Sequence, residues 1–118
     1  MALKLYGITN CDTVKKARGW LESRGVAYDF HDYKKHGVDR KQLETWVREQ
    51  GWEVVLNRAG MTFRKLDPRL TRDLDAASAV ALMVEHPSSI KRPIAVDGKR
   101  TLVGFKPEAY EAAFGAGR

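Results

Sequence analysis

The chain has 118 residues, of which 43% are hydrophobic, so it is long enough for one domain whose core needs no disulfide. Its single cysteine excludes an intramolecular disulfide and is typical of proteins in a reducing compartment. The net charge is +6, no apolar run approaches the roughly 20 residues that cross a membrane, and the first residues lack the layout of a signal peptide. We therefore expect a soluble cytoplasmic protein with no membrane partner.

The first third of the chain predicts a strand–helix–strand unit. Residues 3–7 are a short apolar segment typical of a strand. A helix is expected from Thr13 to Arg24, followed by Gly25 as a C′ residue, and its apolar residues recur three and four apart at Val14, Ala17 and Leu21. Residues 28–33 alternate aromatic and polar side chains, which is the period of a half-buried strand. A unit this short implies a right-handed crossover between parallel strands.

The middle of the chain predicts helices. Asp39 is expected to cap a helix that Gly51 ends, with a buried face made by Leu43, Trp46 and Val47. Residues 52–73 have weak periodicity and predict short helical turns and loops. A further helix is expected over residues 75–85, before the helix-stopping pair at 86–87, and its buried face is predicted at residues 76, 79, 80, 83 and 84.

The last third returns to the period of strands. Residues 94–96 and 100–103 predict a hairpin around an Asp97–Gly98 turn. Pro107 is expected to begin a final helix, which Gly115 follows, and its buried residues are predicted to be Ala109, Tyr110, Ala113 and Phe114. The element order is β-α-β, then helices, then β-β-α. This order favours an α/β thioredoxin-like fold in a single domain over 1–118, with a helical insertion at about 39–86 between its halves.

Cys11 lies in the loop between the first expected strand and the first expected helix. A cysteine at this position faces the positive end of the helix dipole and unpaired backbone N–H groups, which favour the thiolate. Because the thiolate is the nucleophile, Cys11 is the candidate catalytic residue; the alternative is an inert buried cysteine. Asn10, Asp12 and Thr13 are candidates for capping the helix or shaping this loop. Pro93 precedes the third expected strand, where thioredoxin-like folds place a cis-proline opposite the active-site cysteine.

Positive charge is concentrated in two segments. Residues 58–72 and 91–106 each hold five basic side chains and one acid; the basic residues are Arg58, Arg64, Lys65, Arg69, Arg72, Lys91, Arg92, Lys99, Arg100 and Lys106. Such clustering suggests an anionic ligand, with solvated basic loops as the alternative. Neither segment interleaves aromatic residues as nucleic-acid-binding segments do. The histidines, which are His31, His36 and His86, lack the spacing of metal ligands, so we expect no metal and no bound cofactor.

Several blocks along nearly the whole chain resemble those of a known family. They are Tyr6–Ala17, Phe30–Lys34, Gly51–Trp52 with Leu56–Asn57, Phe63–Leu66, Ile90–Ile94 and Val103–Phe105. In these blocks the chain resembles the ArsC/Spx family, and within it the YffB-like branch. The resemblance implies an arsenate-reductase-like protein with a thioredoxin-like fold and a helical insertion.

The resemblance also implies roles for particular residues. Cys11 falls at the nucleophile of the family's arsenate reductases, and Arg92 at one of the arginines that hold the oxyanion. Another of those arginines aligns with Asn57, beside Arg58, and the last aligns with Lys106, which keeps the charge but loses the bidentate fork. We take Cys11 and Arg92 as catalytic. The candidate substrate-binding residues are Asn10, Thr13, Asn57, Arg58, Pro93 and Lys106.

Two further departures from the family pattern lie close to the candidate nucleophile. The histidine that helps to activate the cysteine in arsenate reductases aligns with Gly7, and a serine three residues after the cysteine aligns with Val14. Spx-type regulators commonly switch through a Cys-x-x-Cys pair, and Val14 occupies the second position here. These departures argue against arsenate reduction and exclude that switch.

Three functions remain as hypotheses. The first is a thiol–disulfide oxidoreductase in which Cys11 attacks an oxidised or glutathionylated thiol and glutathione, as co-substrate, resolves the mixed disulfide. The second is an arsenate reductase that takes electrons from glutathione and glutaredoxin. The third is an Spx-like regulator that binds RNA polymerase and in which Cys11 is vestigial. The resemblance and the single cysteine favour the first.

Overall fold

A computed structural model of the protein describes residues 3–98 and 100–115. The chain divides into two compact units, one made of the residues up to 36 together with those from 92 onward, and one made of residues 37–91. The helical insertion expected at about 39–86 falls within the second unit. None of the helices in the described ranges is long and apolar enough to cross a membrane.

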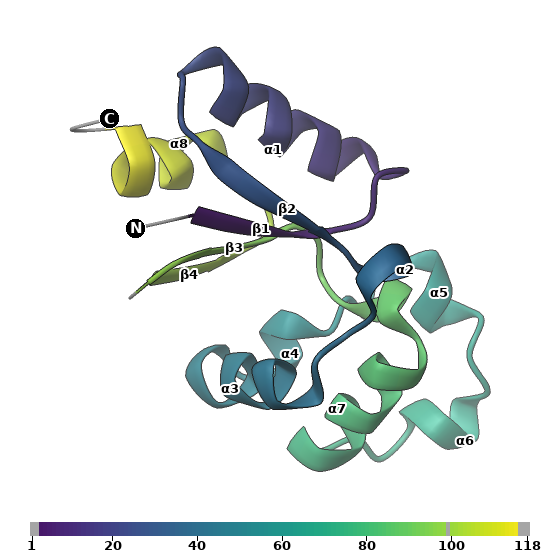
Figure 1. The fold of residues 1–118 in the computed structure, drawn as a ribbon. Helices are drawn as coiled ribbons and strands as arrows, with labels where there is room; N and C mark the ends of the chain where they lie inside the picture. The colour runs from purple at the N-terminus through teal and green to yellow at the C-terminus, as the bar shows by residue number, and fades with distance from the viewer. Residues whose placement is uncertain (1–2, 99, 116–118) are drawn as a thin grey trace. The chain divides into compact units, whose positions relative to one another are not determined.

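The first unit is built on a four-stranded sheet (Figure 1). Its strands are β1 (Leu3–Gly7), β2 (Tyr28–Asp32), β3 (Ile94–Asp97) and β4 (Arg100–Val103). Their order in the sheet is β2-β1-β3-β4, with β1 parallel to β2 and antiparallel to β3, and β3 antiparallel to β4. The predicted α/β class and thioredoxin-like arrangement are confirmed by this topology.

Helices α1 (Asp12–Ser23) and α8 (Pro107–Tyr110) cover the same side of the sheet (Figure 1). A π-helical turn, Glu111–Gly115, continues α8. The core beneath them draws on alternate strand positions and on helix positions three and four apart, and consists of Leu3, Leu5, Ala17, Leu21, Val26, Ala95, Tyr110 and Phe114. The buried face predicted for α1 is therefore confirmed, and Gly25 adopts the predicted left-handed conformation (φ 68°) after the helix.

The second unit is helical, as predicted. Its elements are α3 (Arg40–Gln50), α4 (Trp52–Val55), α5 (Met61–Arg64), α6 (Pro68–Thr71), α7 (Ala76–Glu85) and the 3-10 turn η1 (Pro87–Ser89). Asp39 caps α3 through a hydrogen bond from the Lys41 amide to its carboxylate, and the predicted face of Leu43, Trp46 and Val47 is buried. The segment after Leu56 is fixed by an antiparallel bridge between Leu56 and Ile90, in which the Asn57 amide donates to the Ser89 carbonyl at 2.8 Å.

Two sequence predictions need correction in detail. The predicted strand 28–33 ends at Asp32, because the Asp32 carboxylate accepts the Lys34 amide and starts the short helix α2 (Tyr33–His36). The sequence predicts the hairpin turn at Asp97–Gly98, but Asp97 pairs with Arg100 as the last residue of β3, so the strand extends one residue further and Gly98 follows it. Residue 99, Lys99 of the basic segment, lies outside the described residues.

The buried faces of the last two long helical segments also differ from prediction. In α7 the buried residues are Ala79, Val80, Leu82 and Met83, whereas Ala76 is exposed because it begins the helix beside its capping residue. That cap is Asp75, whose carboxylate accepts the Ser78 amide. In the final segment Tyr110 and Phe114 are buried as predicted, but the alanines at 109 and 113 are only half-buried, and Gly115 belongs to the π-helical turn instead of following the helix.

Candidate active site

All four strands of the first unit end or begin at one edge of the sheet, and the candidate catalytic residues follow there. Parallel β1 and β2 end at Gly7 and Asp32, and antiparallel β3 begins at Ile94, which pairs with both Tyr6 and Val103. The edge therefore carries the loop 8–11, the start of α2, the residues 92–93 and the residues 104–106. The Gly104 amide donates to the Pro93 carbonyl at 2.8 Å, which ties two of these segments together.

Cys11 is the N-cap residue of α1. Its backbone is extended (φ −149°, ψ 121°), and its carbonyl accepts the Lys15 amide at 2.9 Å. The helix therefore begins one residue earlier than predicted, and the N-cap is Cys11 instead of Asn10, Asp12 or Thr13. The Cys11 side chain is half-buried and makes no capping bond to the described residues. The thiol consequently stands at the first turn of a 12-residue helix, where backbone N–H groups lack intrahelical partners and a negative charge is stabilised.

Gly7 and Val14 form an apolar contact beneath the Cys11 loop. Both residues are buried, and a Cβ placed on Gly7 would lie 2.8 Å from a Val14 methyl carbon. This separation is too short for carbon atoms, so the Val14 side chain occupies the space that any side chain at position 7 would need. The two departures from the family pattern therefore have one structural cause. The family's histidine aligns with Gly7 and its serine with Val14, and the Val14 side chain fills the space that a histidine at position 7 would occupy.

We expect Gly7→Ala to destabilise the first unit by about 1–3 kcal/mol, because it overpacks a buried contact. Adding Val14→Ala should recover part of this loss, giving a coupling of about 0.5–3 kcal/mol between the two substitutions. Urea unfolding of the single and double variants measures both quantities. The matched control is Gly19→Ala in the exposed part of α1, where a Cβ meets nothing within 4 Å and should stabilise the helix. Additive losses in the double variant would contradict the proposed contact.

Arg92 and Pro93 precede β3 at the same edge. The Arg92–Pro93 peptide bond is cis, in agreement with the position expected for a thioredoxin-like fold. Pro93 is buried and Arg92 is half-buried, so the guanidinium is not an ordinary surface charge. Among the predicted residues, Cys11, Arg92 and Pro93 are therefore brought to one edge of one unit.

Lys106, Asn10 and Thr13 lie at this edge as exposed residues. Lys106 is the N-cap of α8, and its carbonyl accepts the amides of Ala109 and Tyr110 at 3.0 and 3.1 Å. Its backbone is thereby fixed while its ammonium group is free to extend into solvent. Asn10 precedes Cys11 and Thr13 lies in the first turn of α1, so both are close to Cys11 along the chain.

Asn57 and Arg58 belong to the second unit. A Cβ on Gly60 would lie 2.7 Å from the Asn57 amide nitrogen, so the Asn57 side chain is folded over the turn that ends at Gly60. The Arg58 guanidinium carbon lies 5.4 Å from the centre of the Trp52 ring, which is a cation–π arrangement. Each of the two side chains therefore has a local packing partner, and their part in substrate binding stays a prediction from the sequence.

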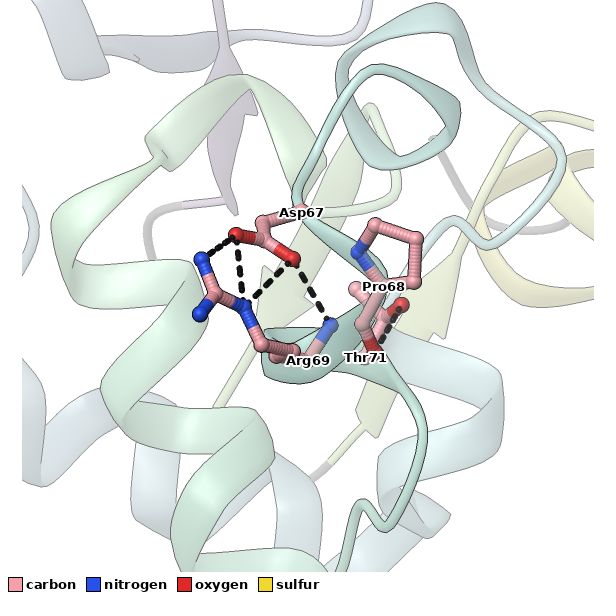
Figure 2. A network of polar contacts seen from close by, with 4 residues as sticks. All are labelled: Asp67, Pro68, Arg69 and Thr71. Carbon is pink, nitrogen blue, oxygen red and sulfur yellow. Dashed lines mark hydrogen bonds and ion pairs between the residues drawn. The ribbon is translucent and has the colours of Figure 1, made fainter.

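Arg69, another basic residue of segment 58–72, also has a partner within the segment. Figure 2 shows the Arg69 guanidinium forked onto the Asp67 carboxylate, with the closest contact at 2.8 Å. The same carboxylate caps α6 by accepting the Arg69 amide at 2.9 Å. These bonds lower the pKa of the Asp67 carboxyl and raise that of Arg69. The positive charge of this segment is thus partly neutralised before any ligand arrives.

An aromatic cluster at the same edge was not singled out as functional by the sequence. Tyr33, the first residue of α2, stacks on Tyr6 with ring centres 6.4 Å apart, and His31 lies 5.0 Å from Tyr6 and 5.8 Å from Tyr33. Burial raises the pKa of the Tyr33 phenol well above its usual range, and the charge of Arg92 acts in the opposite direction. The alternating pattern of residues 28–33 predicts a half-buried strand, but it gives no sign that Tyr33 begins a helix at this edge of the sheet.

Comparison with known proteins agrees with this geometry. Residues 6–113 match the family model described as the ArsC family. A Haemophilus influenzae protein described as uncharacterized is 39% identical over 112 residues, covering 95% of this chain and 98% of its own. Global transcriptional regulator Spx 2 of Bacillus anthracis is 28% identical over 106 residues, covering 88% of this chain and 80% of its own.

Among solved structures, one named YFFB protein is 61% identical and superposes with a TM-score of 0.93, covering 95% of this chain and 98% of its own. The family match covers most of the chain, and the fold carries a single cysteine in the loop before α1. The chain belongs to the ArsC family, whose members are arsenate-reductase-like proteins of thioredoxin-like fold.

Proposed function

We propose that the protein is a thiol–disulfide oxidoreductase that uses Cys11 as its only nucleophile and glutathione as co-substrate. The observation that carries this proposal is the position of Cys11 as N-cap of α1, with its thiol free of capping bonds to the described residues. The backbone N–H groups of the first turn of a helix lack intrahelical partners and can donate to a sulfur atom that takes part in exchange. Because the chain contains no second cysteine, an external thiol must complete the reaction.

The reaction is a pair of thiol–disulfide exchanges. The Cys11 thiolate attacks the glutathione sulfur of a glutathionylated thiol, the old S–S bond breaks, and the substrate leaves as a thiolate that takes a proton from water. Glutathione thiolate then attacks the Cys11–glutathione disulfide, releasing glutathione disulfide and restoring the Cys11 thiolate. Each cycle consumes one free glutathione, and the glutathionyl group removed from the substrate forms the other half of the glutathione disulfide, so the cycle balances without a bound cofactor.

Anion recognition falls to the basic residues at the Cys11 edge. Glutathione carries two carboxylates, and a planar guanidinium can bind a carboxylate through two parallel hydrogen bonds. Arg92, half-buried before Pro93, is placed for this role, and Lys106 supplies a second, less directional charge. Asn10 and Thr13 are close to Cys11 along the chain and are proposed to contact the bound peptide.

Arsenate reduction is the second candidate, favoured by the family match over residues 6–113. The packing of Gly7 against Val14 weighs against it, because the contact fills the space that the aligned histidine would need. A tetrahedral oxyanion also requires several converging donors, and loss of one donor can cost about 10²–10³-fold in rate. Asn57, whose side chain is folded over Gly60, supplies no guanidinium.

The test compares the two substrates on the native chain. We expect steady turnover of a glutathionylated peptide with glutathione, and arsenate turnover with glutathione and glutaredoxin lower by about 10²-fold or more. Intact mass spectrometry after incubation with glutathione disulfide should show one glutathione adduct, located on Cys11. Arsenate turnover equal to or above peptide turnover would favour the second candidate, and the absence of any adduct would refute the first.

A further inference from the structure

The hydroxyl of Tyr33 is a buried polar group with no hydrogen-bond partner among the described residues. The Tyr33 side chain is 4% exposed, and none of the residues in 3–98 and 100–115 accepts or donates a hydrogen bond at its oxygen. Leaving a buried hydroxyl unpaired costs about 1–3 kcal/mol, so such groups usually have a water or a ligand as partner. Within the described part of the chain this hydroxyl has no partner, so it is available to a water or a ligand.

The place of Tyr33 in the fold indicates what that partner is. Tyr33 immediately follows β2 at the sheet edge where Cys11 and Arg92 lie, so it borders the candidate active site within the same unit. Its ring is held from one side by Tyr6 and from another by His31. Arg92 lies at the same edge, where it precedes the cis-proline Pro93 and strand β3. An anion that pairs with Arg92 can accept a hydrogen bond from this hydroxyl at the same time.

We propose that Tyr33 is a substrate-binding residue whose hydroxyl donates a hydrogen bond to the carboxylate that Arg92 pairs with. This inference rests on the proposed function, since the carboxylate is that of the glutathione moiety. It supplies a neutral donor at a site where the family's arginine pattern is incomplete. Tyr33 takes no part in the exchange of sulfur bonds, so its effect is on binding and not on the chemical step.

The experiment measures the rate of Cys11–glutathione adduct formation against the concentration of glutathione disulfide. We expect Tyr33→Phe to raise the half-saturating concentration roughly tenfold and to leave the plateau rate within about twofold of the native value. The matched control is Tyr28→Phe at the opposite end of β2, where the hydroxyl donates to Glu22 at 2.6 Å. That control should keep the native half-saturation.

Thermal stability provides a second measurement, in which Tyr33→Phe and Tyr28→Phe are expected to differ. Tyr33→Phe removes an unpaired buried hydroxyl, so the free protein should keep or gain thermal stability, whereas Tyr28→Phe loses paired hydrogen bonds and should not gain. If Tyr33 instead binds a structural water, Tyr33→Phe lowers stability and leaves half-saturation unchanged, which overturns the proposal. In an Arg92→Ala background, Tyr33→Phe should add less than about twofold, because the shared carboxylate is no longer held there.

Calorimetry with S-methylglutathione, which cannot form a disulfide, tests ligand binding at Tyr33 separately from disulfide exchange at Cys11. Weaker binding to Tyr33→Phe than to the native chain supports the inference even if no Cys11 adduct forms, in which case only the proposed function fails. Equal binding to both overturns the inference while leaving adduct formation as the test of function. No binding to the native chain overturns the inference as well.

Discussion

Replacing Cys11 with serine is expected to abolish adduct formation and turnover while leaving the fold intact or slightly more stable. A serine oxygen is almost entirely protonated at neutral pH and cannot form a disulfide, so neither exchange step can begin. The same substitution is favourable for the helix, because serine is a preferred N-cap residue and its oxygen can accept an amide of the first turn of α1. Cys11→Ser should therefore abolish turnover while the free energy of unfolding stays the same or rises slightly.

Cys11→Ala separates these two effects. It removes the nucleophile as serine does, but it offers no capping oxygen, so it should be less stable than Cys11→Ser by about 0.5–2 kcal/mol. Turnover of a glutathionylated peptide tests the loss of the nucleophile in both variants. Urea unfolding of both variants tests the capping effect. Residual turnover in either variant would show that Cys11 is not the nucleophile, and equal stabilities would show that position 11 does not act as a cap.

Replacing Arg92 with alanine is expected to raise the half-saturating concentration of glutathione disulfide by about 10–100-fold. A charge-assisted hydrogen bond contributes about 1.5–3 kcal/mol, and each 1.4 kcal/mol changes binding tenfold. Arg92→Lys should fall between the native chain and Arg92→Ala, since the lysine keeps the charge but loses the bidentate fork. The measurement is the concentration dependence of adduct formation on Cys11.

Arg100→Ala is the matched control for Arg92→Ala. Arg100 is exposed on β4, at the far end of the β3–β4 hairpin from the Cys11 edge, and it pairs with Asp97 in the sheet. Both substitutions remove one positive charge, so a nonspecific effect of net charge would appear equally in both. Equal half-saturation in the two variants would remove Arg92 from the binding site and leave only a general attraction for anions.

The sequence by itself determined the order of the main strands and helices, although it did not predict α2. Apolar residues three and four apart placed Val14, Ala17 and Leu21 on the buried face of α1, a short apolar segment placed β1 and the period of two placed β2, because these patterns depend only on local backbone geometry. The position of Cys11 before a helix also followed from local pattern. The residue that starts the helix did not, because a cap is decided by which carbonyl the Lys15 amide meets.

Tertiary structure alone decided which residues share the site. Tyr33 and Arg92 are far apart in the chain, and they come to one edge of the sheet because β1 pairs in parallel with β2 and antiparallel with β3. Likewise, the contact between Gly7 and Val14 explains two separate departures from the family pattern as one packing event. Pairing of distant strands and the filling of space between side chains are non-local, so no local pattern of residues encodes them.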